Sequence, residues 1–167
     1  AGASKTDKNG QTENIAVRHF NGTKPTVVAS RSHRGEALEQ LIGRIDSKYG
    51  DADILSMGSS FKLCLVAEGK ADIYPRLGLT SEWDTAAAQC VVEAAGGQVV
   101  DCESQPLRYS KQERLNPWIM VGADSDAGFT CKGFSEEVCA SPGLPAGFWK
   151  PALFWACVDL DSGATRS

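Results

Sequence analysis

The chain has 167 residues, 42% of them hydrophobic and 23% charged, and its formal net charge is −4. This length allows one ordinary hydrophobic core, and the negative charge argues against broad electrostatic binding to nucleic acid or to an anionic membrane. No apolar run approaches the roughly 18–20 residues of a membrane span, and no secretory signal is visible. The 6 cysteines include no C-x-x-C pair, which argues against a zinc site. We favour a reducing, cytoplasmic compartment, although an even cysteine count leaves disulfides open.

Regular structure is expected to begin near residue 15. Residues 1–14 are polar, and we expect a mobile loop there. Ile15–Phe20, Thr26–Ala29 and Ala52–Met57 have the composition and alternation of strands. Between the second and third of these, Gly35–Tyr49 carries apolar residues at helical spacing, so we predict a helix.

The stretch from residue 58 to 97 contains the strongest signals. We predict a helix over Phe61–Glu68, a strand over Ala71–Arg76 and a second helix over Glu82–Ala95. Apolar and small residues recur on the second helix at i, i+3, i+4 and i+7, and this stripe is predicted to face the core. Its members are Trp83, Ala86, Ala87, Cys90, Val91 and Ala94.

The ends of the second helix also carry recognisable signals. Ser81 and Asp84 have the spacing of a capping box, and Gly96-Gly97 supplies a left-handed stop. The carboxylate of Asp84 therefore has a structural explanation, since the helix dipole favours it. The small residues that follow it would also let other backbone groups approach.

Strands alternating with helices predict an α/β layered sandwich, because Gln98–Asp101 and Trp118–Val121 add two more strands after the last helix. In such folds the loops that follow strands hold ligand groups. Candidate positions of this kind lie at Ser30–His33, at Gly58–Ser59 and from Arg76 onward. From residue 125 to 167, glycine and proline recur without a period, and we expect a tail that is less well ordered.

Several separated motifs occur in the order found in one enzyme family. They are S-R-S-H at 30–33, G-S-S-F-K-L-C-L-V-A-E-G-K-A-D-I-Y-P-R at 58–76, and E-W-D-T-A-A-A at 82–88 followed by V-E-A-A-G-G at 92–97. The chain resembles the inositol monophosphatase-like, lithium-sensitive phosphatases, and within them the 3′(2′),5′-bisphosphate nucleotidases. The resemblance implies the C-terminal half of that fold over residues 15–124. It also implies Mg²⁺-dependent hydrolysis of adenosine 3′,5′-bisphosphate to AMP and phosphate, which recycles a by-product of sulfate assimilation.

By resemblance, Asp84 is a Mg²⁺ ligand. The positions that correspond to the family's nucleotide contacts are Ser30, His33, Gly58, Ser59, Lys62 and Arg76. Lys62 and Arg76 suit phosphate, because a cation in an apolar segment is costly unless it meets an anion. The alternative for these two cations is a salt bridge with Glu68 or Asp72. A loop histidine such as His33 is otherwise often a solvated polar residue.

The resemblance leaves the metal site incomplete. The family's other metal motif, D-P-L/I-D-G-T/S, is not found, and the superficially similar run at 158–163 has the wrong spacing, so we interpret it as a polar turn. We expect the missing ligands in an absent N-terminal half of the same domain. Two alternatives remain, an inositol-phosphate phosphatase and a non-catalytic nucleotide-binding fragment.

Overall fold

The computed structural model describes residues 2–30, 35–58, 61–110 and 112–123, and every structural statement below refers to these ranges. The predictions for His33, for Ser59 and for residues 125–167 lie outside them. The strands are β1 (Ala3–Thr6), β2 (Thr12–Ile15), β3 (Thr26–Ala29), β4 (Asp53–Ser56), β5 (Ile73–Arg76), β6 (Thr80–Ser81), β7 (Gln98–Asp101), β8 (Leu115–Asn116) and β9 (Ile119–Gly122). The helices are α1 (Glu36–Tyr49), α2 (Phe61–Ala67) and α3 (Glu82–Ala94).

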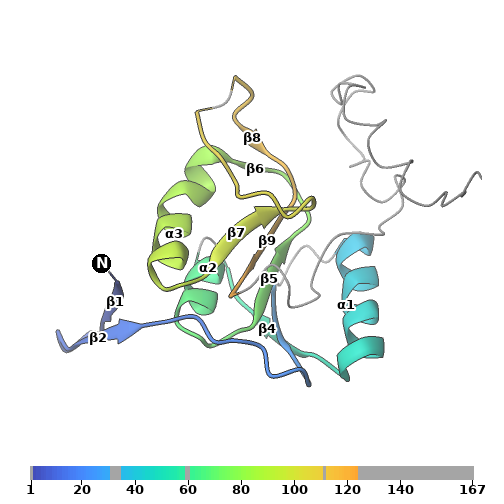
Figure 1. Cartoon of the computed structure of the whole chain (residues 1–167), viewed down its shortest axis with the longest axis horizontal. Coiled ribbons are helices and arrows are strands. Elements are labelled where there is room, and N and C mark those ends of the chain that lie inside the picture. Colours follow the sequence, from blue (N-terminus) through green and yellow to red (C-terminus); the bar gives the residue numbers. More distant parts are fainter. Residues whose placement is uncertain (1, 31–34, 59–60, 111, 124–167) are drawn as a thin grey trace, which may run out of the picture.

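A mixed sheet of five strands in the order β4-β3-β5-β9-β7 forms the centre of the molecule (Figure 1). Strand β3 pairs in parallel with β4 and β5, whereas β9 pairs antiparallel with β5 and β7. Because β3, β4 and β5 are parallel, the segments that follow them leave the sheet at the same edge.

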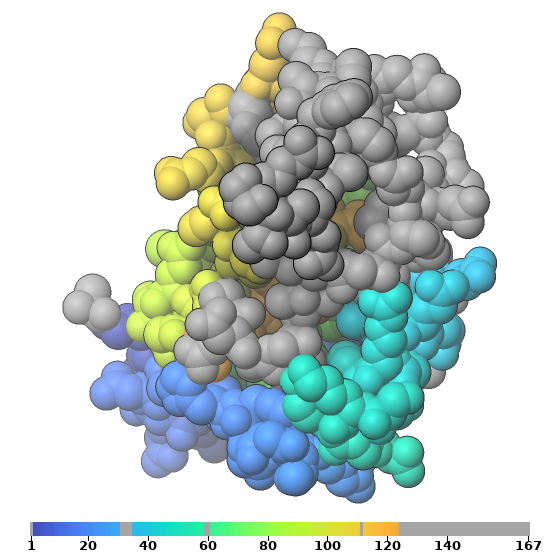
Figure 2. Space-filling model, turned by 45° about the vertical axis from the view of Figure 1, so that its right-hand side comes forward, coloured from blue at the N-terminus to red at the C-terminus, as the bar shows by residue number. Residues whose placement is uncertain are grey.

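Helices cover both faces of this sheet. Alternate residues of β3 separate the two cores: Val27 packs with Leu41 and Ile45 of α1, whereas Val28 packs in the cluster that contains α2 and α3. Figure 2 shows α1 and α3 on opposite flanks of the molecule, as this layering requires. The predicted α/β layered sandwich is confirmed. None of the helices in the described ranges is long and apolar enough to cross a membrane.

Helix α3 lies where the sequence predicted it, but the predicted core-facing stripe is wrong except at Val91, which is partly buried against the core. The buried residues of α3 are Thr85, Ala88, Gln89 and Val92. Trp83 is 68% exposed, and Ala86, Ala87, Cys90 and Ala94 are also exposed. The physical reason is that the polar members of the buried face find partners in distant segments, so they can be buried without losing hydrogen bonds.

Those partners lie after the sheet's strand β7. The Asn116 amide donates to Thr85 Oγ1 at 3.0 Å, to the Ser81 carbonyl at 2.9 Å and to Thr80 Oγ1 at 3.2 Å. Gln89 donates to the Leu107 carbonyl at 3.1 Å. These bonds attach the short β6–β8 sheet, which sequence analysis missed, to the start of α3.

The signals predicted for both ends of α3 are confirmed. The Ser81 N–H donates to Asp84 Oδ2 at 2.8 Å as part of a capping box. At the other end, the Gly97 N–H donates to the Val92 carbonyl at 2.9 Å, and Gly96 has a φ of +88°. This is a Schellman-type ending, which glycine adopts without a steric penalty.

The N-terminal segment differs from the expectation. An antiparallel hairpin of β1 and β2, in which Ala3 pairs with Ile15, occupies most of the segment that was expected to be a loop. The Asp7 side chain organises the turn by accepting hydrogen bonds from the Asn9 and Gln11 N–H groups, both at 2.8 Å. The predicted strand from Ile15 to Phe20 is wrong beyond its first residue, since strand pairing ends at residue 15.

Candidate functional site

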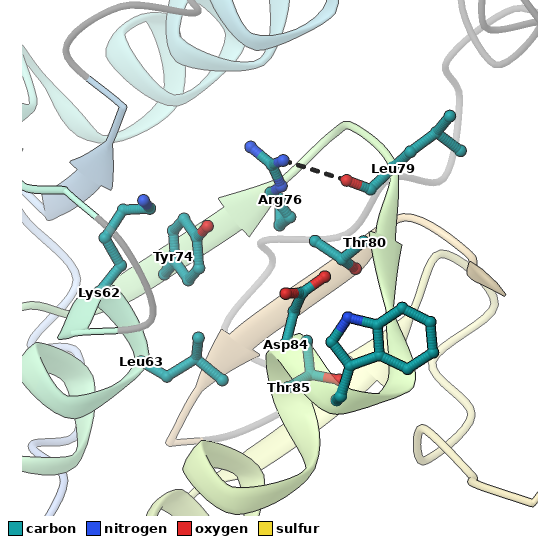
Figure 3. A pocket seen from close by; sticks show the side chains of 9 residues that line it. Lys62, Leu63, Tyr74, Arg76, Leu79, Thr80, Asp84 and Thr85 are labelled. Carbon is teal, nitrogen blue, oxygen red and sulfur yellow. Dashed lines mark hydrogen bonds between the residues drawn. The ribbon is translucent and has the colours of Figure 1, made fainter. Parts of the chain in front are cut away.

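A cavity of about 400 Å³ opens between α2, the end of β5 and the start of α3 (Figure 3). Its lining combines cationic, carboxylate, hydroxyl and apolar side chains. The lining residues are Lys62, Leu63, Tyr74, Arg76, Leu79, Thr80, Trp83, Asp84 and Thr85.

Lys62 is a buried cation in the wall of this cavity, with only 6% of its surface exposed. Its Nζ lies 5.5 Å from the centroid of the Tyr74 ring. Burial lowers the pKa of Lys62 below its usual value, and the positive charge of Arg76 lowers it further. The unliganded site therefore disfavours the charge of this ammonium group, and an anion bound beside it would relieve that cost.

Arg76 ends β5 and is partly exposed. Its Nη2 donates to the Leu79 carbonyl at 3.1 Å, which holds the guanidinium over the turn that follows the strand. The remaining N–H groups of the guanidinium are available to a ligand, and their planar arrangement suits a phosphate.

The predicted alternative, that Lys62 or Arg76 forms a salt bridge with Glu68 or Asp72, is wrong. Glu68 bonds Lys5 at 2.8 Å and Lys70 at 2.6 Å, and Asp72 bonds Arg18 at 2.6 Å. No carboxylate of the described residues forms an ion pair with the two cations of the cavity. The cavity wall therefore carries positive charge that these carboxylates do not neutralise.

Asp84 lies in the first turn of α3, across the cavity from these cations (Figure 3). One carboxylate oxygen accepts the Ser81 N–H, so the structural explanation of this residue holds. The other oxygen is available to a metal ion, and carboxylate oxygen is a ligand that Mg²⁺ prefers. No group of three or more His, Cys, Asp or Glu side chains within the described ranges could hold a metal ion. The described residues therefore offer one carboxylate ligand to a metal ion in this cavity.

The structure brings together some of the predicted site residues and not others. Lys62, Arg76 and Asp84 line one cavity. Ser30 follows β3 and lines a small neighbouring cavity of about 30 Å³ that shares Arg76 with the first. Gly58 is exposed and lines neither cavity, and the structure does not describe His33 or Ser59.

Sequence analysis missed two kinds of lining residue. Tyr74 lines both cavities, and its position two residues before Arg76 on a strand was a usable signal, since such residues share a face. Leu79 lies between β5 and β6, and Thr80 begins β6; no pattern pointed to either of them.

Comparison with known proteins places this chain in a family. The model of the inositol monophosphatase family matches residues 3–124, which include the N-terminal hairpin. The chain is 46% identical over 98 residues to the 3′(2′),5′-bisphosphate nucleotidase CysQ of Escherichia coli K12, covering 58% of this chain and 38% of that protein.

Solved structures agree with the family match. The crystal structure of CysQ from Bacteroides thetaiotaomicron has a TM-score of 0.61 and 44% identity over 67% of this chain and 41% of that one. SuhB of Mycobacterium tuberculosis, with a TM-score of 0.53 and 23% identity over 73% of this chain and 45% of its own, shows the fold alone. The chain thus spans about 38–41% of the length of its CysQ relatives. It belongs to the inositol monophosphatase family.

Proposed function

We propose that this chain forms the phosphate-binding part of a Mg²⁺-dependent 3′(2′),5′-bisphosphate nucleotidase. The substrate is adenosine 3′,5′-bisphosphate, the products are AMP and phosphate, and the reaction recycles a by-product of sulfate assimilation in the cytoplasm. One observation carries the proposal: Lys62 and Arg76 line the same cavity as Asp84, and no carboxylate of the described residues neutralises them. The CysQ relatives are named 3′(2′),5′-bisphosphate nucleotidases, which supports the choice of substrate.

Each side chain has a separate role in this proposal. The guanidinium of Arg76 binds two phosphate oxygens, and the ammonium of Lys62 contributes a nearby positive charge. Asp84 offers a carboxylate oxygen to Mg²⁺, and Ser30, His33, Gly58 and Ser59 complete the nucleotide contacts. A bound Mg²⁺ supplies Lewis-acid activation of the attacking water and stabilises charge on the leaving oxygen. Hydrolysis breaks the bond between phosphorus and the ribose 3′-oxygen, and water contributes the new oxygen.

The remaining metal ligands belong, in this proposal, to a part of the domain that this chain does not span. Mg²⁺ demands near-octahedral oxygen coordination, and Asp84 alone cannot provide it. Residues 15–124 then act as the C-terminal part of the phosphatase domain, with the upstream half as their partner. The second candidate is a nucleotide-binding fragment without catalysis. The observation in its favour is that Asp84 is a single carboxylate, which does not complete a metal site.

Calorimetry tests the substrate. We expect adenosine 3′,5′-bisphosphate to bind the chain more tightly than inositol 1-phosphate, because it carries an additional phosphate for the cations of the cavity. Substitution of Arg76→Met should weaken nucleotide binding about tenfold or more. Equal affinity for the two ligands would favour the inositol-phosphate alternative, and no effect of Arg76→Met would overturn the phosphate assignment.

Catalysis is tested after the corresponding upstream half of Escherichia coli CysQ is joined to the chain. We expect Mg²⁺-dependent release of phosphate, which Asp84→Asn should nearly abolish. Asparagine caps helices well, so a large loss of activity with an unchanged melting temperature would indicate metal ligation and not capping. Full activity of Asp84→Asn would refute the metal assignment, and rapid turnover by the 167 residues alone would refute the need for further ligands.

A further inference from the structure

Tyr74 lies between Lys62 and Arg76, the two cations that line the large cavity (Figure 3). It belongs to β5, is 5% exposed and lines both the large cavity and the small cavity beside it. Its ring contacts the Lys62 ammonium, whose Nζ is 5.5 Å from the ring centroid. Arg76 follows two residues later on the same strand, so its guanidinium lies on the same face. Tyr74 therefore lies in the wall that carries the two cations.

The hydroxyl of Tyr74 has no hydrogen-bond partner among the described residues, and yet every fully buried side-chain nitrogen or oxygen in those ranges has one. The hydroxyl is therefore not fully buried, and Tyr74 belongs to the cavity lining. Figure 3 shows it in the gap between the side chains of Lys62 and Arg76. Tyr109 offers a contrast, because its hydroxyl donates to Gln89 Oε1 within the protein.

We propose that the Tyr74 hydroxyl donates a hydrogen bond to an oxygen of the phosphate that Lys62 and Arg76 hold, which makes Tyr74 a third phosphate-binding residue. This inference rests on the proposed function, since it requires a phosphorylated ligand in this cavity. Burial raises the pKa of Tyr74, so the hydroxyl keeps its proton and remains a donor at neutral pH. A hydroxyl donating to a charged oxygen is among the stronger hydrogen bonds in proteins.

Tyr74 has a second role through its ring. The ring face holds the Lys62 ammonium in the wall while the cavity is empty, which compensates part of the cost of burying that charge. Tyr74→Phe keeps this contact and removes only the hydroxyl. Tyr74→Leu removes both, so the two variants separate the hydrogen bond from the positioning of Lys62.

The test measures binding of inorganic phosphate and of adenosine 3′,5′-bisphosphate to the whole chain. We expect Tyr74→Phe to weaken both affinities about tenfold and Tyr74→Leu to weaken them further. Tyr49→Phe is the matched control, because Tyr49 is the last residue of α1 and packs against the core on the other face of the sheet. It should bind both ligands as the wild type does, and melting temperatures show that each variant is folded.

A spectroscopic measurement tests the same contact without any substitution. The chain has 3 tyrosines, so ¹³C labelling at the ring carbon that bears the hydroxyl gives three assignable signals. Added phosphate should shift the Tyr74 signal most. If Arg76→Met weakens binding but Tyr74→Phe does not, and the Tyr74 signal stays in place, the inference about Tyr74 fails alone. If the wild type does not bind phosphate at all, the proposed function fails and the inference fails with it.

Discussion

The positively charged side chains near the two ends of strand β5 differ in whether a carboxylate pairs with them. Arg18 lies near the start of the strand, and Arg76, with Lys62 of α2, lies near its end. Just before the strand, Asp72 is 7% exposed and accepts hydrogen bonds from Arg18 Nε at 2.8 Å and Arg18 Nη2 at 2.6 Å. The same carboxylate accepts the Thr26 N–H at 2.6 Å, and the hydrogen bonds with Asp72 raise the pKa of Arg18. At the other end, no carboxylate in the described ranges forms an ion pair with Lys62 or Arg76.

This difference distinguishes the charge of Arg18, which has a structural role, from the charges of Lys62 and Arg76, which are available to a ligand. Arg18 and Asp72 satisfy one another and join the N-terminal segment to β3 and β5, so their interaction is complete without any other molecule. Burial of the Lys62 ammonium costs free energy of folding that its contacts with the described residues do not fully offset. Such a cost is typical of binding sites, where stability is reduced in exchange for function.

The largest expected effect comes from breaking the paired end. Asp72→Asn leaves the Arg18 guanidinium without its counter-charge, and we expect a loss of about 2–3 kcal/mol, discounted because Arg18 is partly solvated. For a chain of this size, that corresponds to roughly 4–12 °C in melting temperature. Differential scanning calorimetry measures it. Phosphate affinity should stay within about twofold of the wild type, because Asp72 does not line the cationic cavity.

The double variant Arg18→Met with Asp72→Asn sharpens this result. If the pair acts as a unit, the double variant should be less destabilised than the sum of the two single variants. Strict additivity would show that the two residues stabilise the protein independently, and it would contradict the comparison between the two ends of β5.

Substitution of Lys62, near the end of β5 where no described carboxylate forms an ion pair, should raise the free energy of unfolding, whereas Asp72→Asn lowers it. Lys62→Met replaces a buried cation with an apolar side chain of similar length, and we expect the unliganded protein to gain about 1 kcal/mol while phosphate affinity falls about tenfold or more. Lys48→Met is the matched control, since Lys48 Nζ also contacts a ring, that of Tyr49 at 4.8 Å, but from an exposed position. Chemical denaturation should show little change for the control. Destabilisation by Lys62→Met would mean that Lys62 is a structural residue.

Sequence patterns identified most of the fold because the central elements have strong local signals. The strands β3, β4, β5, β7 and β9 and all helices of the described ranges lie where apolar periodicity placed them. Ser30 and Arg76 were expected near a ligand because loops that follow strands hold ligand groups in α/β folds. Lys62 and Asp84 were found through the family resemblance and lie in the same cavity as Arg76.

Other features depend on contacts that no local pattern contains. Arg18 and Asp72 are 54 positions apart, and Lys5 and Glu68 are 63 apart, so the absence of an acid partner at Lys62 could not be predicted. The buried face of α3 was misassigned because alanines occur on both sides of the helix. The distant Asn116 and Tyr109, which both form hydrogen bonds with Thr85 Oγ1, show why the polar Thr85 lies inside.

The smallest expected effect is a dependence on pH that belongs to the unpaired end alone. Burial lowers the pKa of Lys62 in the folded protein, whereas the unfolded chain keeps the ordinary value near 10.5. Between these two values the unfolded state binds more protons at Lys62, so the contribution of Lys62 to the stability rises with pH. The penalty of the buried charge is complete at neutral pH and shrinks as the pH rises toward 10.5.

Lys62→Met lacks this proton, so its stability advantage over the wild type should be largest near neutral pH. The advantage should narrow as the pH rises from the lowered pKa of Lys62 in the folded protein toward 10.5. Urea unfolding of both proteins across this pH range measures the gap. The raised pKa of Tyr74 does not interfere, because that hydroxyl is present in both proteins. Bound phosphate should narrow the gap at neutral pH, since it stabilises the charged ammonium. A gap that widens with pH would show that the folded protein favours the Lys62 charge, and the contrast between the two ends of β5 would then be lost.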